Sequence, residues 1–179
     1  LRAFLRTLTG GRDGLYLRDE DFAPEAPALE VDVSSFVGLF LSRQAIARTG
    51  LPDERLFIYY DDQLYTLQMR RLGLRLGFLP GIRFEHDTEA VHIDGHMVLR
   101  PLWKVYYAQR NALMAYRVAS GPLFWLLVPL LMLKWHRRAR LYGPDAARYR
   151  RIMRRACRDG LLGRRDLSHA QVTAMAEAD

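Results

Sequence analysis

The chain has 179 residues, of which 50% are apolar and 26% are charged, and its formal net charge at pH 7 is +7. This composition excludes a wholly disordered chain and fits one folded domain, alone or with an appendage. The single cysteine, Cys157, excludes an internal disulfide and is expected to be a small buried apolar residue.

The charge is unevenly distributed along the chain. Residues 1–99 carry a net charge of −4, whereas residues 100–179 carry a net charge of +11. We therefore divide the chain into 1–99 and 100–179 and expect an anionic partner to bind the second part. The chain begins LRAFLRTLTGG, with no initiator methionine and no signal peptide. This start predicts that the chain is a piece of a longer protein.

The first sixty residues predict a loop followed by strands and one short helix. Residues 1–30 contain glycines and prolines among acidic side chains and are expected to form a loop. The run VDVSSFVGLFL at 31–41 has strand character, and Ser42 can cap a helix that ends at Gly50. The run LFIYY at 56–60 predicts a second short strand.

The next segments continue the alternation of helix and strand. A helix is predicted over 62–72, a strand with alternating apolar residues over 74–78, and an extended segment over 82–86. This alternation indicates an α/β layer.

The basic part is predicted to be helical. One helix begins at Pro101 and ends at Gly121-Pro122, and another runs from Gly143-Pro144 to about residue 159. Between them, 123–133 (LFWLLVPLLML) is apolar for 11 residues. Because a bilayer span needs about 20 residues, this run is too short to cross a membrane. The last dozen residues are expected to be frayed.

The block from Val31 to His86 resembles the C-terminal half of the catalytic domain of family-two inverting glycosyltransferases, with rhamnosyl- and galactofuranosyltransferases the most similar. The resemblance rests on a strand with a glycine, a short helix ending in glycine, the phrase GLPDERLFIYYDD at 50–62, and a closing histidine. It implies a partial GT-A (Rossmann-like) α/β sheet region that lacks the N-terminal nucleotide-binding half and is followed by a helical C-terminal extension.

The Asp61-Asp62 pair is the predicted catalytic feature. Inverting sugar transfer needs a base that takes the proton of the acceptor hydroxyl, and a carboxylate after a strand, at the start of a helix, is suited to that role. The resemblance implies that Asp62 is this base, while the adjacent Asp61 faces another way and orients the acceptor or a neighbouring arginine. The structural alternative is that both residues cap the helix and complement its dipole.

The resemblance implies that His86 helps to bind a divalent cation, Mg²⁺ or Mn²⁺, which neutralises the donor diphosphate. The alternative is a structural or exposed histidine. Gly38 is predicted to let a sugar approach the backbone, and a bulge or packing gap is an equal alternative. Arg110-Asn111 resembles a family feature on the helix after the active site, which implies that Arg110 holds a phosphate, with a helix-surface arginine as an equal alternative.

The predicted donor is a nucleotide sugar that binds mostly through the absent half. Asp19-Glu20-Asp21 fits the pattern D-x-D, but it lies too close to Asp62 to match the metal motif of the family. We therefore expect this chain alone to bind nucleotide sugar poorly and to be inactive by itself.

The predicted acceptor is a lipid-linked glycan, and the location is cytoplasmic, peripheral at the inner face of the cell membrane. Tryptophans and arginines flank the apolar run 123–133, which favours contact with a membrane surface. The alternative is that this run packs on the domain. No nucleic-acid-binding module is visible, so no nucleic-acid partner is expected. A second functional hypothesis is a non-catalytic basic module, derived from such an enzyme, that binds a membrane surface or a partner.

Overall fold

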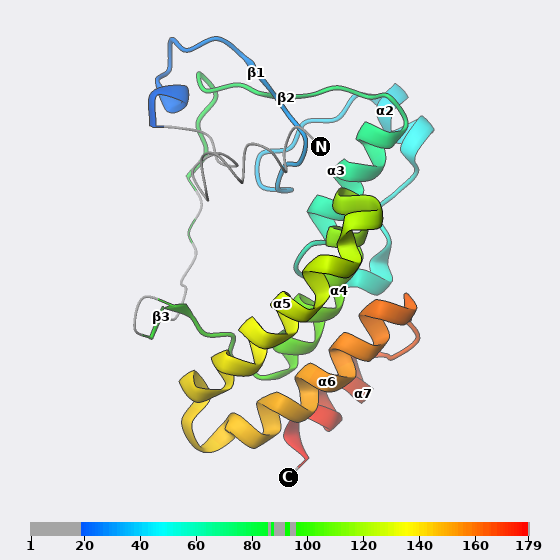
Figure 1. Ribbon diagram of the computed structural model, residues 1–179. Coiled ribbons are helices and arrows are strands. Elements are labelled where there is room, and N and C mark those ends of the chain that lie inside the picture. The colour runs from blue at the N-terminus through cyan, green and yellow to red at the C-terminus, as the bar shows by residue number, and fades with distance from the viewer. Residues whose placement is uncertain (1–18, 86, 88–91, 94–95, 179) are drawn as a thin grey trace.

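The computed structural model describes residues 19–85, 87, 92–93 and 96–178, and these residues are mostly helical (Figure 1). Its N-terminal part contains one short two-stranded sheet with two α-helices beside it. Its C-terminal part is a group of packed helices. The prediction of mixed α and β elements followed by a helical extension is confirmed at this level.

The N-terminal elements are short except for α3. In chain order they are η1 (Asp19–Phe22), β1 (Leu29–Val31), α2 (Arg43–Thr49), η2 (Glu54–Leu56), α3 (Asp61–Arg71) and β2 (Leu76–Phe78). Strands β1 and β2 pair antiparallel, with Glu30 opposite Gly77. Strands β3 (His92–Ile93) and β4 (His96–Met97) form a separate antiparallel pair.

The predicted partial GT-A sheet is not supported by the residues that the structure describes, because neither of their two sheets has a parallel pair. Of the predicted 31–41 strand only Val31 is in β1, and residues 32–42 form bends, a turn and irregular backbone. The predicted strand at 56–60 is absent, and 82–85 has no regular structure. Short apolar runs do not by themselves fix a strand, since a strand also needs a partner for its backbone groups.

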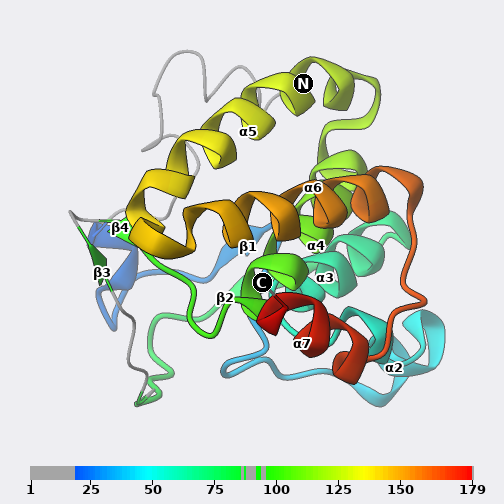
Figure 2. The same cartoon turned by 90° about the horizontal axis from the view of Figure 1, so that it is seen from below.

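The C-terminal elements are helical, and those from α4 to α6 follow one another without a break and reverse direction twice, whereas α7 follows after residues 163–168. They are α4 (Trp103–Ser120), η3 (Gly121–Leu123), α5 (Phe124–Arg138), η4 (Ala139–Asp145), α6 (Ala146–Leu162) and α7 (His169–Glu177). Seen from below, α6 passes between α5 and α7 (Figure 2). By length and composition alone, the run Trp103–Leu162 is long and apolar enough to cross a membrane.

Helix ends follow their local sequence signals. The Ser42 hydroxyl accepts a hydrogen bond from the N–H of Ala45 at 3.1 Å and so caps α2, as predicted. Helix α4 ends at Gly121, whose φ of 54° few other residues adopt without strain. The expectation that the last dozen residues are frayed is wrong. Ser168 and Gln171 form a capping box at the start of α7, and this helix buries Val172.

The main hydrophobic core lies between α4 and α6. It includes the fully buried Val105, Leu113 and Ile152, and α5 and α7 pack against its two sides. The two helices pack closely at Gly160, where a Cβ would lie 2.7 Å from the carbonyl oxygen of Arg110. A smaller cluster of Tyr65, Met69 and Leu76 joins α3 to the β1–β2 sheet.

Candidate functional site

The Asp61-Asp62 pair forms the first turn of α3. The residue before it, Tyr60, is the N-cap and makes no capping hydrogen bond with its side chain. The Asp62 carboxylate accepts a hydrogen bond from the N–H of Gln63 at 2.7 Å, and both carboxylates are half-buried. Two negative charges here complement the positive end of the helix dipole. The two aspartates therefore complement the helix dipole, as the structural alternative expects, but neither of them is the N-cap residue.

The segment that leads into the pair has an uncommon backbone. Phe57, Tyr59 and Tyr60 have φ values of 66°, 63° and 61°. A positive φ is uncommon in residues with a Cβ, because that atom crowds the following carbonyl oxygen. These values explain why the predicted strand at 56–60 does not form. Such outliers persist only where the surrounding structure holds them, and they cluster at functional sites.

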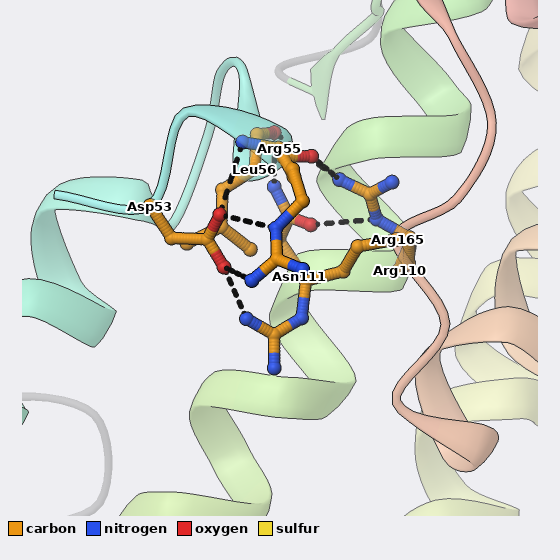
Figure 3. A network of polar contacts seen from close by, with 6 residues as sticks. All are labelled: Asp53, Arg55, Leu56, Arg110, Asn111 and Arg165. Carbon is orange, nitrogen blue, oxygen red and sulfur yellow. Dashed lines mark hydrogen bonds and ion pairs between the residues drawn. The ribbon is translucent and has the colours of Figure 1, made fainter.

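Asn111 on α4 holds this segment through hydrogen bonds to its backbone carbonyls (Figure 3). Its side-chain nitrogen Nδ2 lies 2.9 Å from the carbonyl oxygen of Leu56, 3.1 Å from that of Ile58 and 2.8 Å from that of Tyr59. Asn111 has no exposed surface. One buried amide group therefore satisfies carbonyls of the loop that would find partners in a neighbouring strand if residues 56–60 were a strand.

Arg110 completes the attachment from the adjacent position (Figure 3). Its Nη2 donates to the carbonyl oxygens of Arg55 at 2.8 Å and Leu56 at 3.2 Å, and its Nε donates to Asn111 Oδ1 at 2.9 Å. The guanidinium also lies 5.2 Å from the ring centre of Tyr106. We call these two residues the Arg110–Asn111 clamp.

The clamp corrects one of the two interpretations of Arg110. This side chain has no exposed surface, so it is not the helix-surface arginine of the alternative interpretation. Its hydrogen bonds go to the protein backbone and to Asn111, and its Nη1 is buried without a hydrogen-bond partner among the described residues. Arg110 therefore contacts the loop before Asp61 and Asp62, and its role in binding a phosphate stays a prediction.

Asp53 fastens the same loop to the C-terminal part of the chain. Its carboxylate accepts hydrogen bonds from Arg55 at 2.8 and 2.9 Å and forms an ion pair with Arg165, which lies between α6 and α7 (Figure 3). Hydrogen bonds from Arg55, and then from Arg165, lower the pKa of Asp53 to about 2. The ion pair therefore persists at neutral pH and holds the first residues of the loop against the segment after α6.

A cavity of about 430 Å³ lies between α3, α4 and the end of α6. Asp61 lines it, together with the cationic side chains of Arg71, Arg117 and Arg165. Asp62 does not line it. Burial raises the pKa of Asp61, and the neighbouring Asp62 charge adds to this shift. The two adjacent carboxylates thus have different surroundings, although they share one helix turn.

The raised pKa of Asp61 leads to a stability prediction. The folded state binds the Asp61 proton more tightly than the unfolded chain does, so stability falls as pH rises through the range in which this carboxyl ionises. Asp61→Asn should therefore raise the thermal midpoint at pH 7 by about 1–3 °C, and the gain should shrink near pH 4. Calorimetry at both pH values measures this. Glu25→Gln, at an exposed position, is the control, and an equal gain at both pH values would contradict the assignment.

Gly38 lies in a turn with a φ of 70°. A Cβ at this position would lie 2.8 Å from the ring of Phe84. The ring of Phe84 therefore occupies the space that the missing side chain leaves, which agrees with the packing alternative. The approach of a sugar to the backbone at Gly38 stays a prediction.

His86 lies outside the described residues, so its predicted role in cation binding stays a prediction. Within the described ranges, no three side chains of histidine, cysteine, aspartate or glutamate come together as a metal site. Those residues by themselves do not fit a divalent cation. We therefore derive no chemical step through a metal.

The sequence draws attention to Arg110-Asn111 and to the phrase that contains Asp53, but it does not show the contacts that Asn111, Asp53 and Arg165 make in this site. Asn111 left a signal, because Gln109-Arg110-Asn111 is a polar interruption in a helix whose neighbouring positions are apolar. A polar group in a buried helix face needs partners, and these turn out to be loop carbonyls. Asp53 and Arg165 left no such signal, because two charged residues this far apart in the sequence show nothing of their contact.

Comparisons with known proteins do not place the chain in a family. Neither a protein-family model, nor a curated protein, nor a solved structure matches it.

Proposed function

We propose that this chain is the acceptor-side part of an inverting glycosyltransferase, which moves a sugar from a nucleotide-sugar donor to a lipid-linked glycan. One observation carries the proposal. An Asp-Asp pair at the start of α3 follows a segment with three positive φ values, and the buried Arg110–Asn111 clamp holds that segment in place. The fold tolerates this conformation at some cost, which is common where side chains must be held for chemistry.

The reaction assigns a proton and an electron pair to defined groups. The Asp62 carboxylate accepts the proton of an acceptor hydroxyl as that oxygen forms a bond to the anomeric carbon. The bond from the anomeric carbon to the donor diphosphate breaks on the opposite side, and its electron pair leaves with the nucleoside diphosphate. The configuration at the anomeric carbon is thereby inverted.

The different surroundings of the two aspartates support a division of roles. Asp61 lines the cavity between α3, α4 and α6, which has the size of a small-molecule site, and it would orient the acceptor there. Asp62 lies on the turn that faces the Ser34 region, since Thr66, one turn later, accepts a hydrogen bond from the N–H of Ser34 at 3.2 Å. Asp62 as base and Asp61 as orienting residue is the assignment that we propose.

Donor binding belongs to a nucleotide-binding half in this proposal. A divalent cation, Mg²⁺ or Mn²⁺, with His86 among its ligands, is part of the same expectation. The enzyme would work on the cytoplasmic side, at the inner face of the cell membrane, where a lipid-linked acceptor is present.

The test is Asp62→Asn in the enzyme that joins this chain to its nucleotide-binding half. Loss of the base should lower kcat by roughly 10²–10⁴-fold while the donor dissociation constant, measured by calorimetry, stays nearly unchanged. Asp32→Asn is a matched control, because Asp32 is 76% exposed and lies just after β1. Full activity of the Asp62→Asn enzyme would exclude Asp62 as the base, and inactivity of the unsubstituted enzyme would favour the non-catalytic module instead.

A further inference from the structure

Helix α5 leaves one of its faces uncovered. Its inner face packs on the main core through the buried Phe124, Val128 and Trp135. The opposite face carries large apolar side chains with high exposed fractions, namely Trp125 (59%), Leu126 (69%), Leu130 (64%) and Leu133 (48%). Their spacing places them on one side of the helix. We call these four residues the outer α5 face.

The uncovered surface belongs to the most apolar stretch of the chain. An 18-residue window within the run Trp103–Leu162 has a mean hydropathy of 1.5, and only 11% of it is buried. An apolar window of this kind in the core of a soluble domain would be mostly buried. A contiguous exposed apolar surface of this type marks a site that binds a protein, a ligand or a membrane.

A basic pocket adjoins the outer α5 face. A cavity of about 370 Å³ at the C-terminal end of α5 is lined by four cationic and three leucine side chains: Lys134, Arg137, Arg138, Arg140, Leu130, Leu133 and Leu141. Two of the leucines, Leu130 and Leu133, also belong to the outer α5 face. The apolar face and the cationic pocket are therefore one continuous surface.

The cations of this pocket are not neutralised within the described part of the chain. Residues 95–144 contain no aspartate or glutamate. The next acidic residue in the chain, Asp145, forms ion pairs with Arg100 at 2.6 Å and with Arg148 at 3.4 Å, and neither arginine lines the pocket. None of the salt bridges among the described residues involves Lys134, Arg137 or Arg140. The pocket thus favours an anionic ligand.

We propose that α5 lies flat in the headgroup region of an anionic phospholipid bilayer, with the outer α5 face among the acyl chains and a lipid phosphate in the basic pocket. This inference rests on the membrane location in the proposed function and adds the lipid class and the residues that bind it. With 15 residues, α5 is about 22 Å long, which is too short to span roughly 30 Å of hydrocarbon. An orientation in the plane of the interface suits both its length and its two faces.

The cationic side chains beside the outer α5 face favour a lipid over a protein as the ligand of this surface. A protein that covered the outer α5 face would also desolvate the neighbouring cations, and charged residues are depleted at the centre of protein interfaces. At a membrane the same cations stay at the level of the phosphates while the leucines and Trp125 enter the apolar layer. Tryptophan is enriched at this boundary.

The experiment measures binding of the chain to vesicles of phosphatidylcholine alone and of phosphatidylcholine with phosphatidylglycerol. We expect binding to the anionic vesicles only, with a blue shift of tryptophan emission that the Trp125→Phe variant loses. The triple variant Lys134→Gln, Arg137→Gln, Arg140→Gln should bind the anionic vesicles roughly a hundredfold more weakly. Leu126→Ser with Leu130→Ser should abolish the emission shift.

A second triple variant is the matched control. Arg154→Gln, Arg158→Gln, Arg164→Gln removes the same charge from exposed positions in and just after α6. Equal weakening by both triple variants would overturn the pocket assignment and leave only attraction by net charge. Equal binding to both vesicle types would overturn the preference for anionic lipid.

Three further outcomes complete the test. Vesicle binding that inorganic phosphate abolishes at equal ionic strength would mean that the pocket binds free phosphate rather than lipid. A chain that is dimeric, becomes monomeric on Leu126→Ser with Leu130→Ser, and does not bind vesicles would show that a second copy covers the outer α5 face. Asp62→Asn should bind vesicles as the unsubstituted chain does, so loss of sugar transfer and loss of lipid binding are separate failures.

Discussion

Replacement of Asn111 by leucine should lower the free energy of unfolding by about 3–5 kcal/mol, because one buried and two partly buried carbonyl oxygens lose the amide group that is their common donor. These are the carbonyls of Leu56, Ile58 and Tyr59, and leucine has a similar volume but no N–H group. Arg110 also loses the acceptor of its Nε. Urea unfolding followed by tryptophan fluorescence measures the change.

The control for this substitution is Gln44→Leu. Gln44 is an exposed amide on α2, and its replacement should change the unfolding free energy by no more than about 0.5 kcal/mol. A loss below about 1 kcal/mol for Asn111→Leu would mean that the loop carbonyls find water or other donors, and that the clamp is not what holds the loop.

Milder substitutions of Asn111 test the link between the clamp and the proposed chemistry. If the clamp positions Asp61 and Asp62, Asn111→Ser should lower kcat more than it changes the donor dissociation constant. Asn111→Asp keeps one acceptor for Arg110 Nε but puts an acceptor oxygen in place of the N–H donors, so it should lower kcat at least as much as Asn111→Ser. Unchanged kcat in both variants, with reduced stability, would make the clamp a purely structural feature.

Gly160→Ala should destabilise the protein by about 1–3 kcal/mol, although alanine is the better helix former by about 1 kcal/mol. The added Cβ would lie 2.7 Å from the carbonyl oxygen of Arg110 and 3.1 Å from the Cβ of Leu113. A backbone carbonyl oxygen inside a helix cannot move aside as the end of a flexible side chain can. Helices α4 and α6 must therefore separate, and this movement would also disturb the clamp on α4.

Ala147→Gly provides the reference for Gly160→Ala. It makes the reverse exchange at an exposed position of the same helix and should cost about 0.5–1 kcal/mol through helix propensity alone. Thermal and urea unfolding of both variants separate the effect of helix propensity on stability from the effect of packing between α4 and α6. Stabilisation by Gly160→Ala would mean that α4 and α6 do not pack as closely as the structure has them.

The helices were predictable because their signals are local. Ser42 begins α2, Gly121 ends α4, and the apolar spacing in α3, α4 and α6 repeats within each helix, so neighbouring residues carry the information. The same holds for β2, whose alternation of apolar residues is visible in the sequence. Helix α7 was missed although Ser168 and Gln171 form a recognisable capping pair, because its apolar face is short.

The candidate site was predictable only in part. The sequence placed Asp61 and Asp62 at the start of a helix, and the structure has them there. It also drew attention to Arg110 but did not show that this side chain is fully buried, because a sequence shows that a residue is charged and not whether it is enclosed. That Phe84 fills the space at Gly38 was equally hidden, since the two residues are far apart in the chain.

The sequence by itself determined the helical part, the placement of the aspartate pair, and a basic half whose charge favours an anionic partner. The tertiary structure decided what lies between the helices. Residues 56–60 have the composition of a strand, yet they form a bent loop because the amide of Asn111 on α4 satisfies their carbonyls. A backbone conformation that is held by a donor 52 to 55 positions away is a property of packing, and no local pattern of residue types contains it.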